Sequence, residues 1–490
     1  ATESVDTDGD GVGDNADAFP DDASESVDTD GDGIGDNQDL DNIGSYLGRA
    51  YHMTASTSPN LSEVHIINTS DSAQSFTGTL FHKSGSQLGD SDVALHETLI
   101  ESQGRLILSS SDLEQRFNEL PWTGPAMLDV RSNDQFELMT KLSRNGRVTN
   151  TNCVRTDNVH NLEGNDSSDV SYIRFINDGT AALSNIRGTL YDANGDPIGE
   201  SDALFFDELG AREAVFRSRD SISNIVGDTW TGVASLVLSD TYENLKLMNL
   251  NFVNDETFFN FSCYQGANDD DGALQLGRAY HMTASTSPNL SEVHIINTSD
   301  SAQSFTGTLF HKSGSQLGDS DVALHETLIE SQGRLILSSS DLEQRFNELP
   351  WTGPAMLDVR SNDQFELMTK LSRNGRVTNT NCVRTDNVHN LEGNDSSDVS
   401  YIRFINDGTA ALSNIRGTLY DANGDPIGES DALFFDELGA REAVFRSRDS
   451  ISNIVGDTWT GVASLVLSDT YENLKLMNLN FVNDETFFNF

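Results

Sequence analysis

The chain has 490 residues, with 78 acidic and 30 basic side chains and a formal net charge of −48. This excess of negative charge excludes nucleic acid and anionic membranes as direct partners and favours cations. No apolar run reaches the about 18 residues that cross a bilayer, so we expect no membrane insertion.

The acidic N-terminal segment, residues 1–46, is expected to bind calcium. It contains a pattern of alternating aspartates followed by glycine, which begins at Asp6 and recurs 22 residues later at Asp28. Calcium takes about six to eight oxygen ligands, and alternating carboxylates can face one ion if the chain turns sharply after them, as Gly11 and Gly33 permit. The predicted ligands, with backbone carbonyls at the two apolar positions, are Asp6, Asp8, Asp10, Val12, Asp14, Asp17, Asp28, Asp30, Asp32, Ile34, Asp36 and Asp39.

The sequence after each loop separates the candidate calcium-binding families. EF-hands and dockerins need a helix there, and Pro20 argues against one. Residues 5–41 instead resemble the thrombospondin type 3 repeats of bacterial surface proteins. This resemblance implies a calcium-wrapped rod with little regular secondary structure. The cysteines common in that family are absent here, so the metal alone would hold the segment, and a disordered acidic linker is the alternative.

The rest of the chain is an exact tandem duplication, because residues 47–261 recur unchanged as residues 276–490. Each unit consists of two diverged halves of about 110 residues, a size typical of one small domain. Residues 62–68 align with residues 171–177, for example. We therefore expect four domains of one fold, and we expect the sequence to be part of a longer chain. The predicted domains are residues 47–160, 161–264, 276–389 and 390–490, with an acidic linker at 265–275 that is either solvated or holds a further calcium ion.

The four domains are predicted to be antiparallel β-sandwiches. Short segments of alternating or β-branched character lie between clusters of glycine, asparagine, aspartate and serine, at residues 64–67, 76–81, 105–108, 126–130 and 136–142. This spacing makes the fold all-β, with tandem immunoglobulin-like sandwiches as the default and a jelly roll as the alternative. Hairpin turns are expected at Gly85 and Gly195.

A single helical turn is expected in the first domain. Ser111 and Glu114 have the spacing of a capping box, and Leu113 and Phe117 would share the face that packs on the sandwich.

Tryptophan occupies one position in every half and is always followed by Thr-Gly. A tryptophan that opens a strand is typical of a core or domain junction, and a sugar-stacking platform is the alternative. The four residues are Trp122, Trp230, Trp351 and Trp459.

In the first unit, cysteine closes the last strand of each half, at Cys153 and Cys263. A bridge between these two would indicate an oxidising compartment, and buried free thiols are the alternative.

The sequence does not predict an enzyme. The histidines are scattered and have no counterparts in the second half of the unit, which does not fit a repeated active site; they are His52, His65, His82, His96 and His160. Asp92 and Asp202 could be acids or calcium ligands, but a turn-stabilising role is the favoured interpretation.

Together these features predict a calcium-stabilised, extracellular or cell-surface repeat protein, part of a bacterial surface adhesin, matrix fibre or self-assembling filament. Self-association is the expected partnership, through contacts between identical repeats or exchange of edge strands. Two alternatives are open: a secreted module that binds carbohydrate or another cell-surface ligand, and an accessory array on a secreted enzyme.

Overall fold

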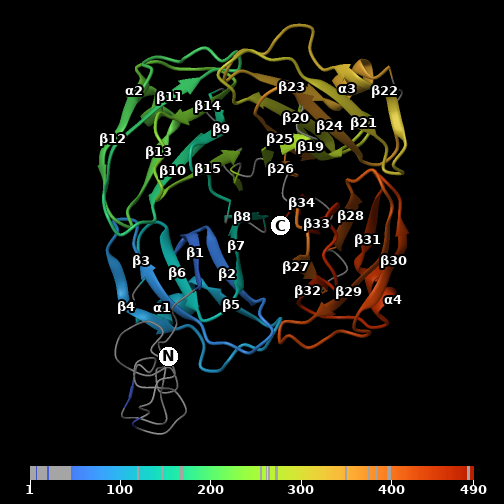
Figure 1. Ribbon diagram of the computed structural model, residues 1–490. Helices are drawn as coiled ribbons and strands as arrows, with labels where there is room; N and C mark the ends of the chain where they lie inside the picture. Colours follow the sequence, from blue (N-terminus) through green and yellow to red (C-terminus); the bar gives the residue numbers. More distant parts are fainter. Residues whose placement is uncertain are drawn as a thin grey trace. The chain divides into compact units, whose positions relative to one another are not determined.

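The computed structural model describes most of the repeated region (Figure 1). All twelve predicted calcium ligands lie outside the described residues, as does Cys263. The chain divides into two compact units, Ala1–Thr140 and Lys141–Phe490, which are treated separately below. The described residues are 7, 19–20, 46–118, 121–144, 147–151, 153–164, 170–253, 257–260, 262, 265–266, 268–270, 274–347, 350–373, 376–380, 383–393, 399–482 and 486–489.

The first unit contains the first sandwich, in which two antiparallel sheets enclose one apolar core. One sheet has the order β1-β6-β3-β4, and the other contains β5-β2-β7. Val64, Leu80 and Leu128 come from both sheets and are fully buried in the core. The elements are β1 (Tyr46–Met53), β2 (Leu61–Asn68), β3 (Thr77–Phe81), β4 (Gln87–Ala94), β5 (Arg105–Ser109), α1 (Ser110–Arg116), β6 (Ala126–Ser132) and β7 (Phe136–Arg144), which runs across the unit boundary.

The second unit starts within β7, contains β8 (Arg147–Asn150), and continues into the second sandwich. There the sheets have the orders β12-β11-β14-β9 and β13-β10-β15-β16. The elements, drawn in green shades in Figure 1, are β9 (Asn158–Glu163), β10 (Val170–Asn177), β11 (Leu183–Tyr191), β12 (Ala203–Leu209), β13 (Ala214–Ser218), α2 (Arg219–Val226), β14 (Val233–Leu238), β15 (Leu245–Val253) and β16 (Thr257–Asn260).

The third sandwich repeats the first. Its sheets have the orders β18-β19-β24-β21-β22 and β17-β25-β20-β23, and β26 also pairs with β25. The elements are β17 (Gln265–Gly266), β18 (Asn268–Asp270), β19 (Leu274–Met282), β20 (Leu290–Asn297), β21 (Thr306–Phe310), β22 (Gln316–Ala323), β23 (Arg334–Ser338), α3 (Ser339–Arg345), β24 (Ala355–Ser361), β25 (Phe365–Arg373) and β26 (Arg376–Asn379).

The fourth sandwich repeats the second, with sheets of order β27-β32-β29-β30 and β31-β28-β33-β34. The elements are β27 (Asn387–Glu392), β28 (Val399–Asn406), β29 (Leu412–Tyr420), β30 (Ala432–Leu438), β31 (Ala443–Ser447), α4 (Arg448–Val455), β32 (Val462–Leu467), β33 (Leu474–Val482) and β34 (Thr486–Asn489).

The predicted fold class is confirmed: the chain forms tandem antiparallel β-sandwiches with four short helices among the described residues. The strand order adds a detail that the sequence did not give. The first two strands of an immunoglobulin domain are neighbours in one sheet, whereas here β1 pairs with β6 and β2 pairs with β5. The sandwiches are therefore immunoglobulin-like in their layers but not in their connectivity.

Two predicted boundaries move by a few residues. The boundary at 160/161 falls inside β9, which pairs with β14 in the second sandwich, and the boundary at 389/390 falls inside β27 in the same way. The acidic linker is also more structured than a solvated spacer. Its described parts pair with the third sandwich, Gln265 opposite Leu367 and Asn268 opposite Leu276.

The predicted helix exists, but its predicted cap is wrong. The N-cap is Ser109, which forms a capping box with Asp112, and Ser111 lies inside α1. Glu114 does not cap the helix because its carboxylate accepts hydrogen bonds from the backbone N–H and hydroxyl of Ser56, at 2.8 and 2.7 Å. Leu113 and Phe117 are buried as predicted, on the face that packs against the core.

Candidate functional site

The candidate residues singled out in the sequence do not gather into an active site. His65 is buried beside Glu63, His82 bonds to Ser84, and His96 bonds to Thr98 two residues away. Within the described ranges, no three or more histidine, cysteine or acidic side chains are placed to hold a metal ion. None of the helices in this part of the chain has the length and apolar character that a membrane crossing requires.

The predicted turn position is correct for Asp202, which precedes β12, and wrong for Asp92, which lies inside β4 where the β3–β4 register shifts. Both have a left-handed backbone, with φ of 51° and 55°. Their backbone N–H groups donate to the hydroxyls of Thr79 and Thr189, at 3.1 and 2.9 Å. A short polar residue tolerates this conformation better than most others do, so each aspartate shapes an irregular step between neighbouring strands.

The repeated tryptophans belong to the core. Each is 6–7% exposed, and each indole N–H donates to a backbone carbonyl, that of Met53, Leu162, Met282 or Leu391. The core interpretation is therefore confirmed. Cys153 is disulfide-bonded, and its partner lies outside the described residues.

The chemically distinctive places in residues 141–490 are the junctions between sandwiches. At the junction of the second and third sandwiches, a hairpin turn meets the start of a strand. The N–H of Arg334, the first residue of β23, donates to the carbonyl of Ala193 at 3.0 Å. Gly195 in that turn has φ of +90°, and a Cβ there would lie 2.3 Å from the carbonyl oxygen of Ser331. Only glycine fits this approach.

The junction of the third and fourth sandwiches uses the same joint. The N–H of Ala443, the first residue of β31, donates to the carbonyl of Lys312 at 2.8 Å. Gly314 has φ of +80°, and a Cβ there would lie 2.2 Å from the carbonyl oxygen of Ala440. The same turn of one sandwich therefore docks on the same strand of the next, twice in succession.

Side chains make the second-to-third junction charged. Glu366 accepts from Arg155 and lies 3.0 Å from Nε2 of His160. Burial alone would raise the pKa of Glu366, but its hydrogen bonds to His160 and Arg155 and the positive charge of Arg155 outweigh burial and lower the pKa to about 2. Lys370 adds an ion pair with Glu163 across the junction, at 3.6 Å.

Arg334 also crosses this junction with its side chain. Its Nη1 donates to the carbonyl of His160 at 2.7 Å, and its Nη2 donates to the hydroxyl of Ser235. Burial, together with the charges of Arg334 and Arg155, lowers the pKa of His160 despite Glu366, so this imidazole is neutral near pH 7.

The third-to-fourth junction combines an ionic network with an apolar cluster. Asp358 lies between Arg278 at 3.2 Å and Arg441 at 3.1 Å, and Arg278 also reaches Asp407 at 3.4 Å. The hydroxyl of Tyr280 donates to Asp407 at 2.9 Å. Burial raises the pKa of Asp358, and the facing arginines offset that only in part. The surrounding apolar cluster includes Met356, Ile405, Met477 and Leu479.

A fully buried arginine also crosses this second junction. Nη1 of Arg403 donates to the carbonyl of Tyr280, and Nη2 donates to that of Pro354 at 3.4 Å. Burial lowers its pKa to about 9, and no carboxylate among the described residues pairs with it. Its guanidinium lies 5.6 Å from the ring centre of Phe445, so a carbonyl pair and an aromatic face stabilise the cation.

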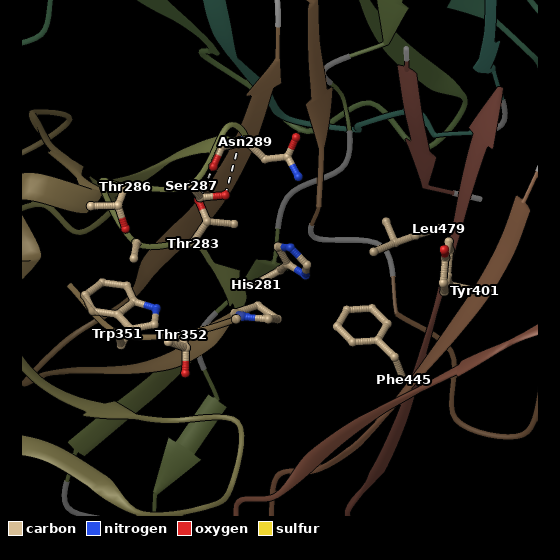
Figure 2. A pocket seen from close by; sticks show the side chains of 13 residues that line it. His281, Thr283, Thr286, Ser287, Asn289, Trp351, Thr352, Tyr401, Phe445 and Leu479 are labelled. Atoms are coloured by element: carbon tan, nitrogen blue, oxygen red, sulfur yellow. Dashed lines mark hydrogen bonds between the residues drawn. The ribbon is translucent and has the colours of Figure 1, made fainter. Parts of the chain in front are cut away.

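Beside Arg403 a cavity of 540 Å³ opens between the third and fourth sandwiches. Figure 2 shows Trp351 and His281 of the third sandwich on one side and Phe445, Tyr401 and Leu479 of the fourth on the other. The remaining lining residues are small, hydroxyl-bearing or amide-bearing, namely Thr283, Ala284, Thr286, Ser287, Asn289, Thr352, Gly353 and Pro354.

Comparison with known proteins adds no family to this description. No protein-family model matches the chain, and no curated protein matches it.

Proposed function

We propose that this protein is an extracellular, calcium-stabilised structural repeat protein, part of a surface adhesin, matrix fibre or filament. The observation that supports this most is the joint used at both junctions of residues 141–490. Each joint places a glycine turn of one sandwich on the first strand residue of the next, here Arg334 and Ala443. A contact between two different surfaces of the same domain can be repeated along an array.

The junctions are suited to carrying load. A backbone hydrogen bond fixes each joint, and buried charged groups such as Glu366 and Arg403 then hold the facing sandwiches in one orientation. Rotating two sandwiches apart would leave these groups buried without partners or would have to hydrate them, and either change is costly. Such an array is stiffer than domains joined by a flexible linker.

Calcium and an extracellular location belong to the same proposal. The 15 carboxylates of residues 1–46 repel one another, and bound calcium would neutralise part of that charge. The disulfide at Cys153 supports an oxidising compartment.

Electron microscopy of the negatively stained chain, in millimolar calcium and in excess chelator, tests the proposal. We expect rods or ordered fibres in calcium that soften or come apart in chelator. A matched variant removes four of the predicted ligand carboxylates: Asp8→Asn, Asp10→Asn, Asp30→Asn and Asp32→Asn. In both conditions its images should resemble those of the parent chain in chelator, while its tryptophan fluorescence stays unchanged. Flexible monomers of the same appearance with and without calcium would refute the proposal.

A further inference from the structure

We propose that the cavity between the third and fourth sandwiches binds an uncharged sugar unit of a glycan. The site is independent of the structural role proposed above. Its volume of 540 Å³ falls within the range of about 300–1,000 Å³ that is common for small-ligand sites. Thr286, Thr352 and Gly353 are exposed lining residues, so the cavity has a mouth open to solvent.

The lining is uncharged, although the protein as a whole is strongly acidic. No aspartate, glutamate, lysine or arginine lines the cavity, and its one histidine is His281. Burial and the neighbouring charge of Arg403 hold the pKa of His281 well below its usual value. A charged ligand would lose hydration without gaining a counter-charge, so this lining favours a neutral one.

The aromatic side chains of the cavity are held in place before any ligand arrives. The indole of Trp351 is fixed by its hydrogen bond to Met282. The ring of Phe445 lies nearly perpendicular to the rings of His281 and Tyr401, at ring-centre distances of 6.1 and 6.3 Å. Trp351 remains a core residue, whereas Phe445 and Tyr401 are half-buried, and such rigid rings can present an apolar surface to the C–H face of a pyranose at little entropic cost.

The third-sandwich side of the cavity also carries polar groups suited to hydroxyls, and Figure 2 shows Thr286, Ser287 and Asn289 on the side of Trp351. Nδ1 of His281 lies 3.4 Å from Nη1 of Arg403 and accepts from it, so the neutral imidazole carries its proton on Nε2 as a donor. The amide oxygen of Asn289 is buried and accepts no hydrogen bond from the described residues. Its side chain can therefore turn to a ligand without losing a bond at that oxygen. Hydroxyls of Thr286 and Ser287 complete the polar side.

The equivalent positions at the other junction are not aromatic. Glu292 stands where the fourth sandwich has Tyr401, and Ile336 stands where it has Phe445. Both residues are exposed, Ile336 at 41% and the Glu292 side chain at 51%. The aromatic pair Tyr401 and Phe445 thus belongs to the third-to-fourth junction and not to the joint itself. Ile336, at the position equivalent to Phe445, therefore provides a matched control.

The test uses the full chain and a panel of neutral sugars: glucose, galactose, mannose, N-acetylglucosamine and their β-linked disaccharides. Binding is measured by saturation-transfer NMR and calorimetry, with glucuronic acid and indole as the charged and aromatic comparison probes. Because the two copies are identical in sequence, each substitution is made in both: Phe216→Ala with Phe445→Ala, Asn60→Ala with Asn289→Ala, and the control Ile107→Ala with Ile336→Ala.

We expect at least one neutral sugar to bind saturably and the phenylalanine and asparagine variants each to weaken it about tenfold or more. The isoleucine control should leave binding unchanged. Asn289 is only partly buried, so the asparagine variant should still fold. Weaker binding by this variant therefore cannot be attributed to misfolding. The proposal is overturned if no sugar of the panel binds, if glucuronic acid or indole binds as well as the best sugar, or if the isoleucine variant loses binding equally.

Discussion

The two junctions within residues 141–490 share one backbone joint and differ in the side chains that fill it. At the second-to-third junction, charged groups such as Glu366 and Arg155 meet, whereas the third-to-fourth junction has an ionic network inside an apolar and aromatic cluster. The joint depends on a glycine turn, which every half retains. The geometry of the array is therefore set by the backbone, and the divergence of the two halves changes the chemistry of the interface without moving it.

The difference also shows what each junction requires. The attraction within buried ion pairs is offset in part by lost hydration, while burial of apolar area contributes stability directly. The third-to-fourth junction buries both kinds of group, so we expect it to be the stronger of the two and the more sensitive to single substitutions.

The largest loss of stability is expected from Arg441→Met. Arg441 contacts the buried carboxylate of Asp358 at 3.1 Å and lies over the ring of Phe310. Its removal leaves Asp358 buried with fewer cations, a change that typically costs about 3–5 kcal/mol. Calorimetric unfolding measures the loss. The control Arg416→Met removes an exposed pair with Asp431 and should cost under about 1 kcal/mol. Equal losses from the two variants would show that the network does not stabilise the junction.

An intermediate effect is expected from alanine at the joint glycines. Gly195→Ala and Gly314→Ala each add left-handed backbone strain and a clash with a carbonyl oxygen of the next sandwich. For each variant the two effects should lower the free energy of unfolding by about 3 kcal/mol. Gly456→Ala is the matched control, because Gly456 has φ of +77° with nothing within 4 Å of a new Cβ, so only the strain of about 1–2 kcal/mol applies. Hydrogen exchange at β23 and β31 measures which joint opens. If the three variants behave alike, the turns do not hold the sandwiches together.

Local pattern and repetition were enough to predict the sandwiches. Alternation of apolar residues gave the strands, and recurrence in all four halves marked Trp122 and its equivalents as core residues. The cap of α1 was misplaced because the carboxylate of Glu114 is taken by Ser56, 58 residues away, which a local rule cannot detect.

The junction residues could not be predicted either, because their partners lie even farther away in the sequence. Arg155 meets Glu366 across 211 residues, and Arg403 meets Tyr280 across 123. One signal was present: Arg403 interrupts an otherwise apolar run in β28, between Ile402 and Phe404. A cation inside a buried strand must find acceptors on another element, and here it finds them on the neighbouring sandwich.

The smallest expected effect is the change in stability of the two junctions in acid. The contribution of Glu366 should decrease as the pH falls, whereas that of Asp358 should increase. The pKa of Glu366 is lowered from the usual 4.5 to about 2, so its contribution is complete above pH 4.5 and is lost as the pH falls toward 2. By pH 3 the loss is about 2 kcal/mol. The pKa of Asp358 is raised, so the cost of its charge is relieved, not increased, as the pH falls toward 3.8.

Calorimetry of the full chain and of Glu366→Gln between pH 7 and pH 3 isolates the Glu366 contribution, because glutamine does not titrate. The difference in unfolding free energy between the two proteins should narrow by about 2 kcal/mol at pH 3. Glu326→Gln, at an exposed site of the third sandwich, should keep a constant difference from the parent. If the gap for Glu366→Gln also stays constant, the charged contacts at the second-to-third junction are not formed in solution. The array would then be held by its backbone joints and by the apolar cluster of the other junction.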